Sequence, residues 1–136
     1  MPFLIKAAVA DVGAESFSFA AQKTMYRGKD IRVGDEIFVF ASENEGGQGL
    51  IARGVVTFVE PVKKARAEIR VTPRVSIKVK RTGTARRRLG RAELKAFRDW
   101  DDGRPETEIA FKFYRQATNK IGGISDETAA FLRTFF

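Results

Sequence analysis

The sequence of 136 residues contains neither cysteine nor histidine. Without cysteine the chain has no disulfide framework, no thiolate nucleophile and no Cys-ligated zinc, and we expect it in a reducing, cytoplasmic compartment. Without histidine, Ser-His-Asp sites, Cys-His sites and histidine-bound metals are excluded. Any catalysis would have to use lysine, carboxylate, tyrosine, serine or threonine groups, and we expect no metal and no other cofactor.

Long hydrophobic runs and internal repeats are also lacking. The apolar start, residues 1–10, is short and lacks a basic segment followed by a long apolar core. We therefore expect a first strand there, not a signal peptide or a membrane span, and no membrane partner. The hydrophobic fraction of 43% and the 12 phenylalanines suffice for one core, so residues 1–136 are expected to form a single domain.

Positive charge is in excess. The chain has 25 Lys and Arg against 17 Asp and Glu, which gives a formal net charge of +8. Such a domain attracts polyanions through counterion release, and nucleic acid is the commonest partner of this kind. A basic face also suits an acidic protein partner, so an interaction domain is an alternative.

Strand patterns occupy the first half of the chain. Residues 2–9 and 36–41 read as strands, and residues 50–59 form the second arm of a hairpin that begins with 36–41. Gly54 within that arm predicts a bulge or a bend. Residues 15–23 fit a short helix or a strand equally well.

The clearest alternation runs over residues 68–80. Its apolar face carries Ile and Val, interrupted by Pro73, which indicates an edge position, a bulge or two short strands. Its other face is basic, and it is either a solvated edge protected by cations or a phosphate-binding strip. The cations that would bind phosphate there are Arg70, Arg74, Lys78 and Lys80.

Further elements follow toward the C-terminus. A turn at residues 82–84 precedes the basic run Arg86, Arg87 and Arg88, which is either a phosphate-contacting loop or a solvated one. We expect a helix over residues 91–100, a strand over 108–115, and a helix over 126–134 with Ser125 as N-cap. The sequence therefore contains about six strands and two or three short helices, without the strand–helix alternation of βαβ units. This pattern predicts a mixed-to-antiparallel barrel.

Three stretches, taken in order, resemble the PUA-like superfamily with its EVE, ASCH, YTH and PUA branches. The first is residues 24–29 with 31–42, a basic stretch, a Gly-Asp turn and an aromatic strand that ends at Ser42. The second is residues 49–56, and the third is residues 111–121 with the last helix. The resemblance implies a mainly β (α+β) fold, a PUA-like β-pseudo-barrel flanked by helices.

The resemblance also implies a pocket between barrel and helices for a flipped, often modified base of RNA or DNA. It would be lined by residues 24–27, 42–43 and 114–119. Its candidate ligand-binding residues are Thr24, Tyr26, Arg27, Ser42, Glu43, Trp100, Tyr114, Thr118 and Asn119. Lys29 and Lys120 would hold phosphate beside it. Glu43, as an acceptor for an exocyclic amine, would read cytosine- or adenine-like edges.

An enzyme is the runner-up interpretation. Residues 20–24 also resemble the ASCH signature, in which a Lys, a Thr and a Glu form a hydrolytic set on modified nucleosides. Lys23 fits the lysine, Tyr26 stands where the threonine would be, and Glu60 is one option for the acid. A non-catalytic binding module is favoured over this hydrolase, and the oligomeric state stays open.

Overall fold

The computed structural model describes residues 1–63, 73–98, 102–116 and 118–136. Within them, six strands close into a barrel in the order β1-β3-β4-β5-β2-β6. They are β1 (Phe3–Ala7), β2 (Ser16–Met25), β3 (Glu36–Ala41), β4 (Gly49–Pro61), β5 (Arg74–Thr84) and β6 (Lys120–Gly123). β1 runs parallel to β3, β2 runs parallel to β6, and the other neighbours are antiparallel. The mixed barrel predicted from the sequence is confirmed.

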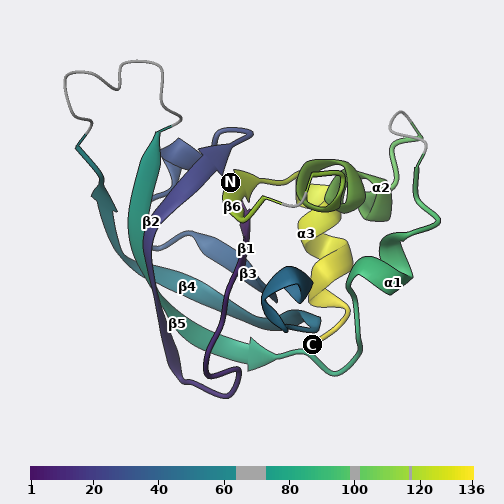
Figure 1. Ribbon diagram of the computed structural model, residues 1–136, viewed down its shortest axis with the longest axis horizontal. Coiled ribbons are helices and arrows are strands. Elements are labelled where there is room, and N and C mark those ends of the chain that lie inside the picture. Colours follow the sequence, from purple (N-terminus) through teal and green to yellow (C-terminus); the bar gives the residue numbers. More distant parts are fainter. Residues whose placement is uncertain (64–72, 99–101, 117) are drawn as a thin grey trace.

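Short helices cover one side of the barrel (Figure 1). They are α1 (Arg91–Leu94), α2 (Pro105–Ile109) and α3 (Asp126–Arg133), with the π-helical turn η3 (Ala110–Tyr114) following α2 directly. Two 3₁₀ turns, η1 (Gly28–Asp30) and η2 (Glu43–Glu45), follow β2 and β3. The N-cap of α3 is Ser125, whose hydroxyl accepts from the Thr128 amide, as its sequence position predicted.

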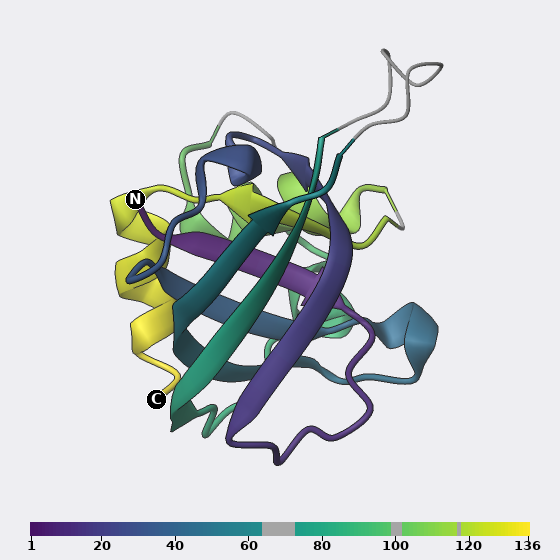
Figure 2. The same cartoon turned by 90° about the vertical axis from the view of Figure 1, so that its left-hand side faces the viewer.

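Two hydrophobic cores result from this arrangement. One fills the barrel and includes Phe3, Ile5, Ile37 and Ile121, and the other lies between the barrel and the helices. Because β1 and β3 contribute to both cores, they are buried on both faces, unlike β5, in which buried and more exposed residues alternate. Among the described residues, no α-helix covers the outer face of β2, of β5 or of most of β4 (Figure 2).

The predicted strand over residues 108–115 is wrong, since α2 and η3 occupy that stretch. Ile109, Phe111 and Phe113 alternate in sequence, but only Ile109 and Phe113, four residues apart, are fully buried. Pro105 begins the helix, and Glu108 pairs with Lys112 at the same i,i+4 spacing. Helical contacts with the barrel therefore outweigh the strand-like pattern.

Other boundaries differ as well. The expected helix over residues 91–100 is regular only in α1, and its end at Trp100 lies outside the described residues. The expected turn at residues 82–84 belongs to β5, and residues 15–23 fall mostly in β2. β6 was not expected as a separate strand, because two of its four residues are glycine.

β5 is not an edge strand. It pairs with β4 on one side and β2 on the other, so barrel closure satisfies both of its hydrogen-bonding rims. Pro73 precedes the strand, and Arg70 lies outside the described residues. The bend expected at Gly54 is confirmed by a register shift between Arg53 and Gly54, where a Cβ would lie 2.5 Å from the Lys80 carbonyl oxygen.

Candidate functional site

Two lysines face each other beneath the helices. Side chains alternate along a strand, and since Ile5 and Ile121 point into the barrel, Lys6 and Lys120 point outward to the helix layer. The two residues are direct partners across β1 and β6. Their exposed fractions are 1% and 2%, so the structure buries two like charges side by side. Among the described residues, neither lysine takes part in a salt bridge.

Tyrosine rings flank this lysine pair. The Lys6 Nζ lies 4.7 Å from the centroid of the Tyr114 ring, in η3. The Lys120 Nζ lies 5.9 Å from the centroid of Tyr26, which directly follows β2, and Lys112 lies 5.1 Å from the same ring. At these distances the ring quadrupoles attract the ammonium groups. Gly122 lets η3 approach the sheet, because a Cβ there would lie 2.9 Å from Phe113.

Glu43 and Ser42, at the end of β3, complete the cluster. The Tyr114 hydroxyl donates to Glu43 Oε1 at 3.0 Å, and the Arg91 amide donates to Glu43 Oε2. The hydroxyl of Ser42 is buried and has no hydrogen-bond partner among the described residues. We call Lys6, Lys120, Tyr26, Tyr114 and Glu43 the lysine–tyrosine site.

Backbone strain marks the same place. Tyr26 and Arg27 have φ values of 52° and 67°, the left-handed region that bulky residues rarely adopt. The carbonyl of Tyr26 accepts a hydrogen bond from the Gly123 amide at 2.9 Å, which ties the turn to β6. Strained residues held by surrounding structure cluster at ligand sites, so the conformation of Tyr26 supports a binding role.

Burial shapes the electrostatics of this site. Desolvation lowers the pKa of Lys6, an effect that Glu43 opposes and that Lys120 and Arg91 reinforce. Desolvation also lowers the pKa of Lys120. Burial, followed by the charge of Glu43 and its hydrogen bond, raises the pKa of Tyr114 far above its usual value. Tyr114 is therefore a neutral donor at physiological pH, and its hydroxyl is oriented by Glu43.

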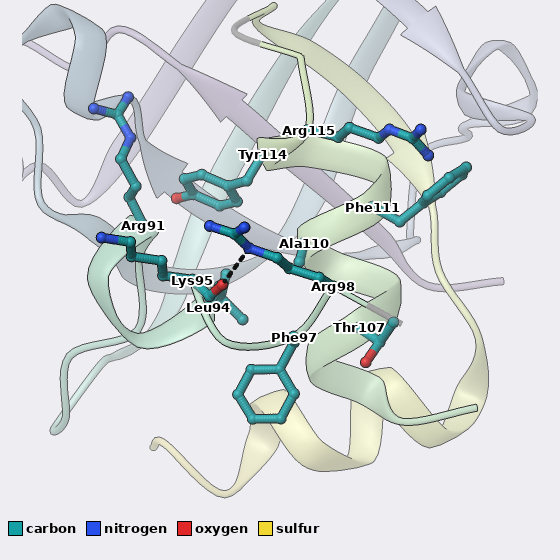
Figure 3. Close-up of a pocket in the computed structure, with 10 residues that line it drawn as sticks. All are labelled: Arg91, Leu94, Lys95, Phe97, Arg98, Thr107, Ala110, Phe111, Tyr114 and Arg115. Carbon is teal, nitrogen blue, oxygen red and sulfur yellow. Dashed lines mark hydrogen bonds between the residues drawn. The ribbon is translucent and has the colours of Figure 1, made fainter. Parts of the chain in front are cut away.

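A cavity of about 500 Å³ borders Tyr114, between α1 and the α2–η3 segment (Figure 3). Its apolar wall consists of Leu94, Phe97, Ala110, Phe111 and Tyr114, together with Thr107. Four cations stand around it: Arg91, Lys95, Arg98 and Arg115. We call this space the helical cavity. Its volume falls in the range of small-molecule sites in proteins.

The residues expected in the pocket are partly brought together. Tyr26, Ser42, Glu43, Tyr114 and Lys120 gather around the lysine pair, although only Tyr114 among them lines the helical cavity. Thr24 is buried, and its hydroxyl donates to the Pro73 carbonyl at 2.7 Å. Thr118 and Asn119 are half-buried just before β6, and Trp100 lies outside the described residues.

The expected phosphate contacts are more scattered. Arg27 and Lys29 are exposed at η1, where Arg27 pairs with Asp30. Lys78 and Lys80 are exposed on the outer face of β5, whereas Arg74 is half-buried and donates to the Ala21 carbonyl. Arg87 stacks on Phe135 and donates to the Thr134 carbonyl, and Arg86 and Arg88 are exposed.

The hydrolase interpretation gains little from the geometry. Lys23 and Glu60 are both exposed, so Lys23 lacks the desolvated setting in which a lysine acts as a base. Among the described residues, no group of three or more Asp and Glu side chains could hold a metal ion. No helix in the described part of the chain is long and apolar enough to span a membrane.

Sequence reasoning missed Lys6 and most residues of the helical cavity. Lys6 is the one charged residue in the otherwise apolar stretch 2–9, which is a signal for a buried charge once that strand is known to be covered on both faces. The cavity residues Phe97, Phe111 and Arg115 carry no such signal. They meet only because α1 and η3 pack side by side.

Neither a family model nor a curated protein matches the chain. Solved structures match it over almost its whole length. A protein from Pseudomonas putida has a TM-score of 0.64 at 15% identity, covering 99% of each chain. The human THYN1 protein, solved in complex with DNA containing 5-methylcytosine, has a TM-score of 0.62 at 15% identity, covering 98% of this chain and 95% of that one.

An ASCH protein from Zymomonas mobilis has a TM-score of 0.54 at 10% identity, covering 98% of this chain and 96% of that one. At these identities the similarity concerns the fold. The protein has the PUA-like fold shared by EVE and ASCH domains, as the order of its sequence stretches predicted.

Proposed function

We propose that this protein is a non-catalytic nucleic-acid-binding domain that receives an extruded base at the lysine–tyrosine site. The observation that carries the proposal is the buried pair Lys6 and Lys120, flanked by the rings of Tyr26 and Tyr114. Burying two like charges is costly unless a bound group compensates them. The net charge of +8 and the DNA complex of the similarly folded THYN1 support nucleic acid as that ligand.

The chemistry of the site suits a base with an acceptor-rich edge. Each ammonium group offers donors to carbonyl and ring-nitrogen acceptors, which cytosine presents on its Watson–Crick edge. The tyrosine rings offer stacking surfaces. Both oxygens of Glu43 already accept from protein groups, so its role in this proposal is to position Tyr114 rather than to read an exocyclic amine.

Binding requires a side-chain movement. The two lysines are almost fully buried, so a base reaches them only after Tyr26 or Tyr114 rotates aside. Rotamer changes of this kind are common at binding sites. Modified cytosine in DNA is the first ligand to test and single-stranded RNA the second, and we place the activity in the cytoplasm, in keeping with the absence of cysteine.

The test is a binding titration with labelled oligonucleotides at several salt concentrations. Single- and double-stranded DNA with cytosine or 5-methylcytosine and a matching RNA are compared. We expect K6M and K120M each to weaken binding by at least about tenfold, the effect of one lost hydrogen bond to a charged group. The matched control is K63M, which removes an exposed lysine two residues beyond the end of β4 and should change affinity by less than about twofold.

Two outcomes would overturn the proposal. One is the absence of binding by the wild type to every oligonucleotide. The other is an equal effect of K6M, K120M and K63M, which would indicate a diffuse polyanion surface without a base site. Release of a shortened or free nucleoside product by the wild type would replace the proposal with the hydrolase.

A further inference from the structure

The helical cavity is separate from the lysine pair but shares one wall with it. Tyr114 lines the cavity, and the same ring lies 4.7 Å from Lys6 Nζ. Groups bound in two sites that share one tyrosine side chain are close enough to belong to one strand of nucleic acid. The proposed base site leaves this cavity without a role.

The walls of the cavity combine aromatic rings with positive charge. Phe97, Phe111 and Tyr114 provide flat apolar surface, and four cations stand around them. Among the described lining residues there is no Asp or Glu, and the carboxylate of Glu43, which contacts the lining residues Tyr114 and Arg91, accepts from their hydroxyl and amide. An apolar wall with an all-cationic rim is complementary to an aromatic ring that carries a phosphate.

Two arginines of the cavity lining point in opposite directions: Arg98 toward Tyr114, and Arg115 toward Phe111, away from Arg98 (Figure 3). Arg98 donates its Nε to the Lys95 carbonyl at 3.2 Å, which leaves its terminal nitrogens available, and Figure 3 shows its guanidinium directed toward the Tyr114 ring. The guanidinium of Arg115 lies 5.2 Å from the centroid of the Phe111 ring. Guanidinium groups held in this way bind phosphate through two parallel hydrogen bonds.

We propose that the helical cavity binds the nucleotide that neighbours the extruded base, with that nucleotide's base stacked on Phe97, its phosphate bound by Arg98, and the next phosphate along the nucleic acid bound by Arg115. This inference rests on the proposed function and extends it from a single base to at least two consecutive nucleotides. It predicts that a short oligonucleotide binds more tightly than the isolated nucleotide, in proportion to the stacking gained.

The experiment compares a mononucleotide with a trinucleotide that carries the same preferred base at its centre. For the wild type we expect the trinucleotide to bind roughly 5- to 150-fold more tightly, the range for one base–aromatic stack. R98A and R115A should remove most of this gain and leave mononucleotide binding unchanged. Each should also reduce the salt slope for the trinucleotide by about 0.7.

The matched control is R32A, because Arg32 is exposed and does not line the cavity. Its salt slope and its gain from chain length should equal those of the wild type, and thermal unfolding should show that all the variants fold. Tripolyphosphate serves as a competitor with phosphate groups but no base.

Each outcome bears on one proposal. Equal binding of mononucleotide and trinucleotide by the wild type overturns the second site and leaves the base site standing. No binding of either overturns the proposed function itself. If tripolyphosphate displaces the labelled trinucleotide as effectively as the unlabelled trinucleotide does, the proposed base stacking is wrong and the cavity is only a phosphate site.

Discussion

At the scale of single residues, Lys6 and Lys120 conflict with stability. An ammonium group in a protein interior costs several kcal/mol after relaxation (about 2–5 in typical cases), and two such groups repel each other. The cation–π contacts with Tyr114 and Tyr26 offset part of this cost, at about 0.5–2 kcal/mol each. Because the two buried lysines lower the stability of the fold, a role in binding is the simplest explanation for their presence.

This conflict predicts that K120M stabilises the fold at neutral pH while it weakens binding. Methionine fills similar space and carries no charge, so we expect the free energy of unfolding to rise by about 1–3 kcal/mol. The urea midpoint of the variant against the wild type measures this difference. A lower urea midpoint for K120M would show that the Lys120 ammonium group stabilises the fold. The buried charge would then no longer be evidence for a binding role.

The same pair should show a pH signature. Burial lowers the pKa of Lys120 in the folded state, so between that pKa and the unfolded value of about 10.4 the unfolded state binds more protons. Wild-type stability therefore gains from rising pH in that window, whereas K120M lacks this gain. The advantage of K120M should be full below the folded pKa of Lys120 and should shrink as the pH rises from that pKa to about 10.4.

The residues of the site differ in how far the sequence predicted them. Tyr26, Ser42, Glu43 and Tyr114 were reached through the order of the family-like stretches, since they are far apart along the chain. Lys6 was not, because its burial depends on helices that pack over β1. The role expected of Glu43 also changes, since the sequence does not show that Tyr114 and Arg91 donate to it.

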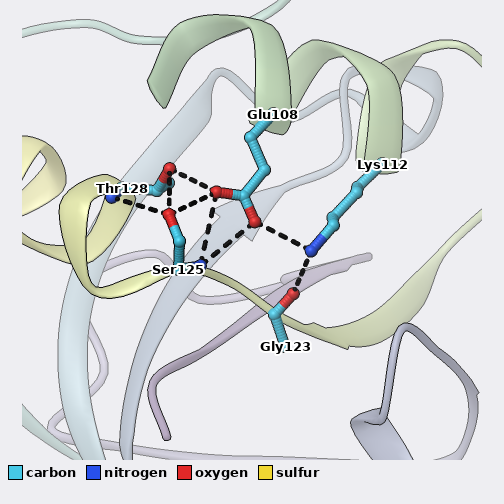
Figure 4. Close-up of polar contacts among 5 residues, drawn as sticks. All are labelled: Glu108, Lys112, Gly123, Ser125 and Thr128. Carbon is cyan, nitrogen blue, oxygen red and sulfur yellow. Dashed lines mark hydrogen bonds and ion pairs between the residues drawn. The ribbon is translucent and has the colours of Figure 1, made fainter. Parts of the chain in front are cut away.

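At the scale of elements, a carboxylate joins the helices that cover the barrel (Figure 4). Glu108 in α2 accepts from the Ser125 hydroxyl and the Thr128 hydroxyl at the start of α3, and from Lys112 at 2.8 Å. Lys112 also donates to the Gly123 carbonyl in β6. The network therefore fixes α2, α3 and β6 together, and it holds η3 with Tyr114 in place.

Replacing Glu108 with glutamine should lower the free energy of unfolding by about 1–3 kcal/mol, because charge-assisted hydrogen bonds to a half-buried group become neutral or are lost. E106Q is the control, since Glu106 is half-buried in the same helix and its carboxylate has no hydrogen-bond or salt-bridge partner among the described residues. Chemical denaturation of both variants measures the difference. Equal midpoints for E108Q and E106Q would contradict a role for this network.

The pH dependence has a definite sign. Burial alone raises the pKa of Glu108, but the hydrogen bonds from Lys112, Ser125 and Thr128 outweigh it and bring the pKa below its usual value. The stabilisation is therefore present above the unfolded pKa of about 4.3 and is lost as the pH falls through the folded value. The stability difference between wild type and E108Q should shrink in that acidic range.

Elements were predictable where local pattern and tertiary contacts agree. Residues 36–41 form β3 with the predicted bounds, and the Ser125 cap marked α3 correctly. The predicted strand over residues 108–115 was wrong because two patterns fit the same residues. Ile109, Phe111 and Phe113 alternate as in a strand, but Ile109 and Phe113 alone also fit the buried face of a helix. The choice between them is made by the barrel surface against which Phe113 packs, and no local pattern contains that surface.

At the scale of the whole molecule, the barrel has two different walls. Helices cover β1, β3 and β6, whereas in the described part of the chain no α-helix covers the outer face of β2, of β5 or of most of β4 (Figures 1 and 2). The lysine–tyrosine site and the helical cavity lie on the helical side. The basic alternation that the sequence suggested as a phosphate strip, with Lys78 and Lys80, lies on the bare wall.

A ligand bound on the helical side should leave the bare wall largely free. Exposed cations that do not touch phosphate add only a screened, long-range attraction, whereas each phosphate contact on a single strand contributes about 0.7 to the salt slope. A K78S/K80S double variant should therefore keep the wild-type salt slope within about 0.3, with an affinity loss below about threefold. An R98A/R115A double variant should reduce the slope by about 1.4.

Titrations of both double variants with the same trinucleotide, from low to moderate salt, decide between the walls. Both variants remove two positive charges, so the change in net charge is matched and any difference in slope reports location. A loss of about 1.4 for K78S/K80S with little change for R98A/R115A would place the nucleic acid on the bare barrel wall. Equal, partial losses of salt slope in both double variants would mean that the nucleic acid wraps around the barrel and contacts both walls.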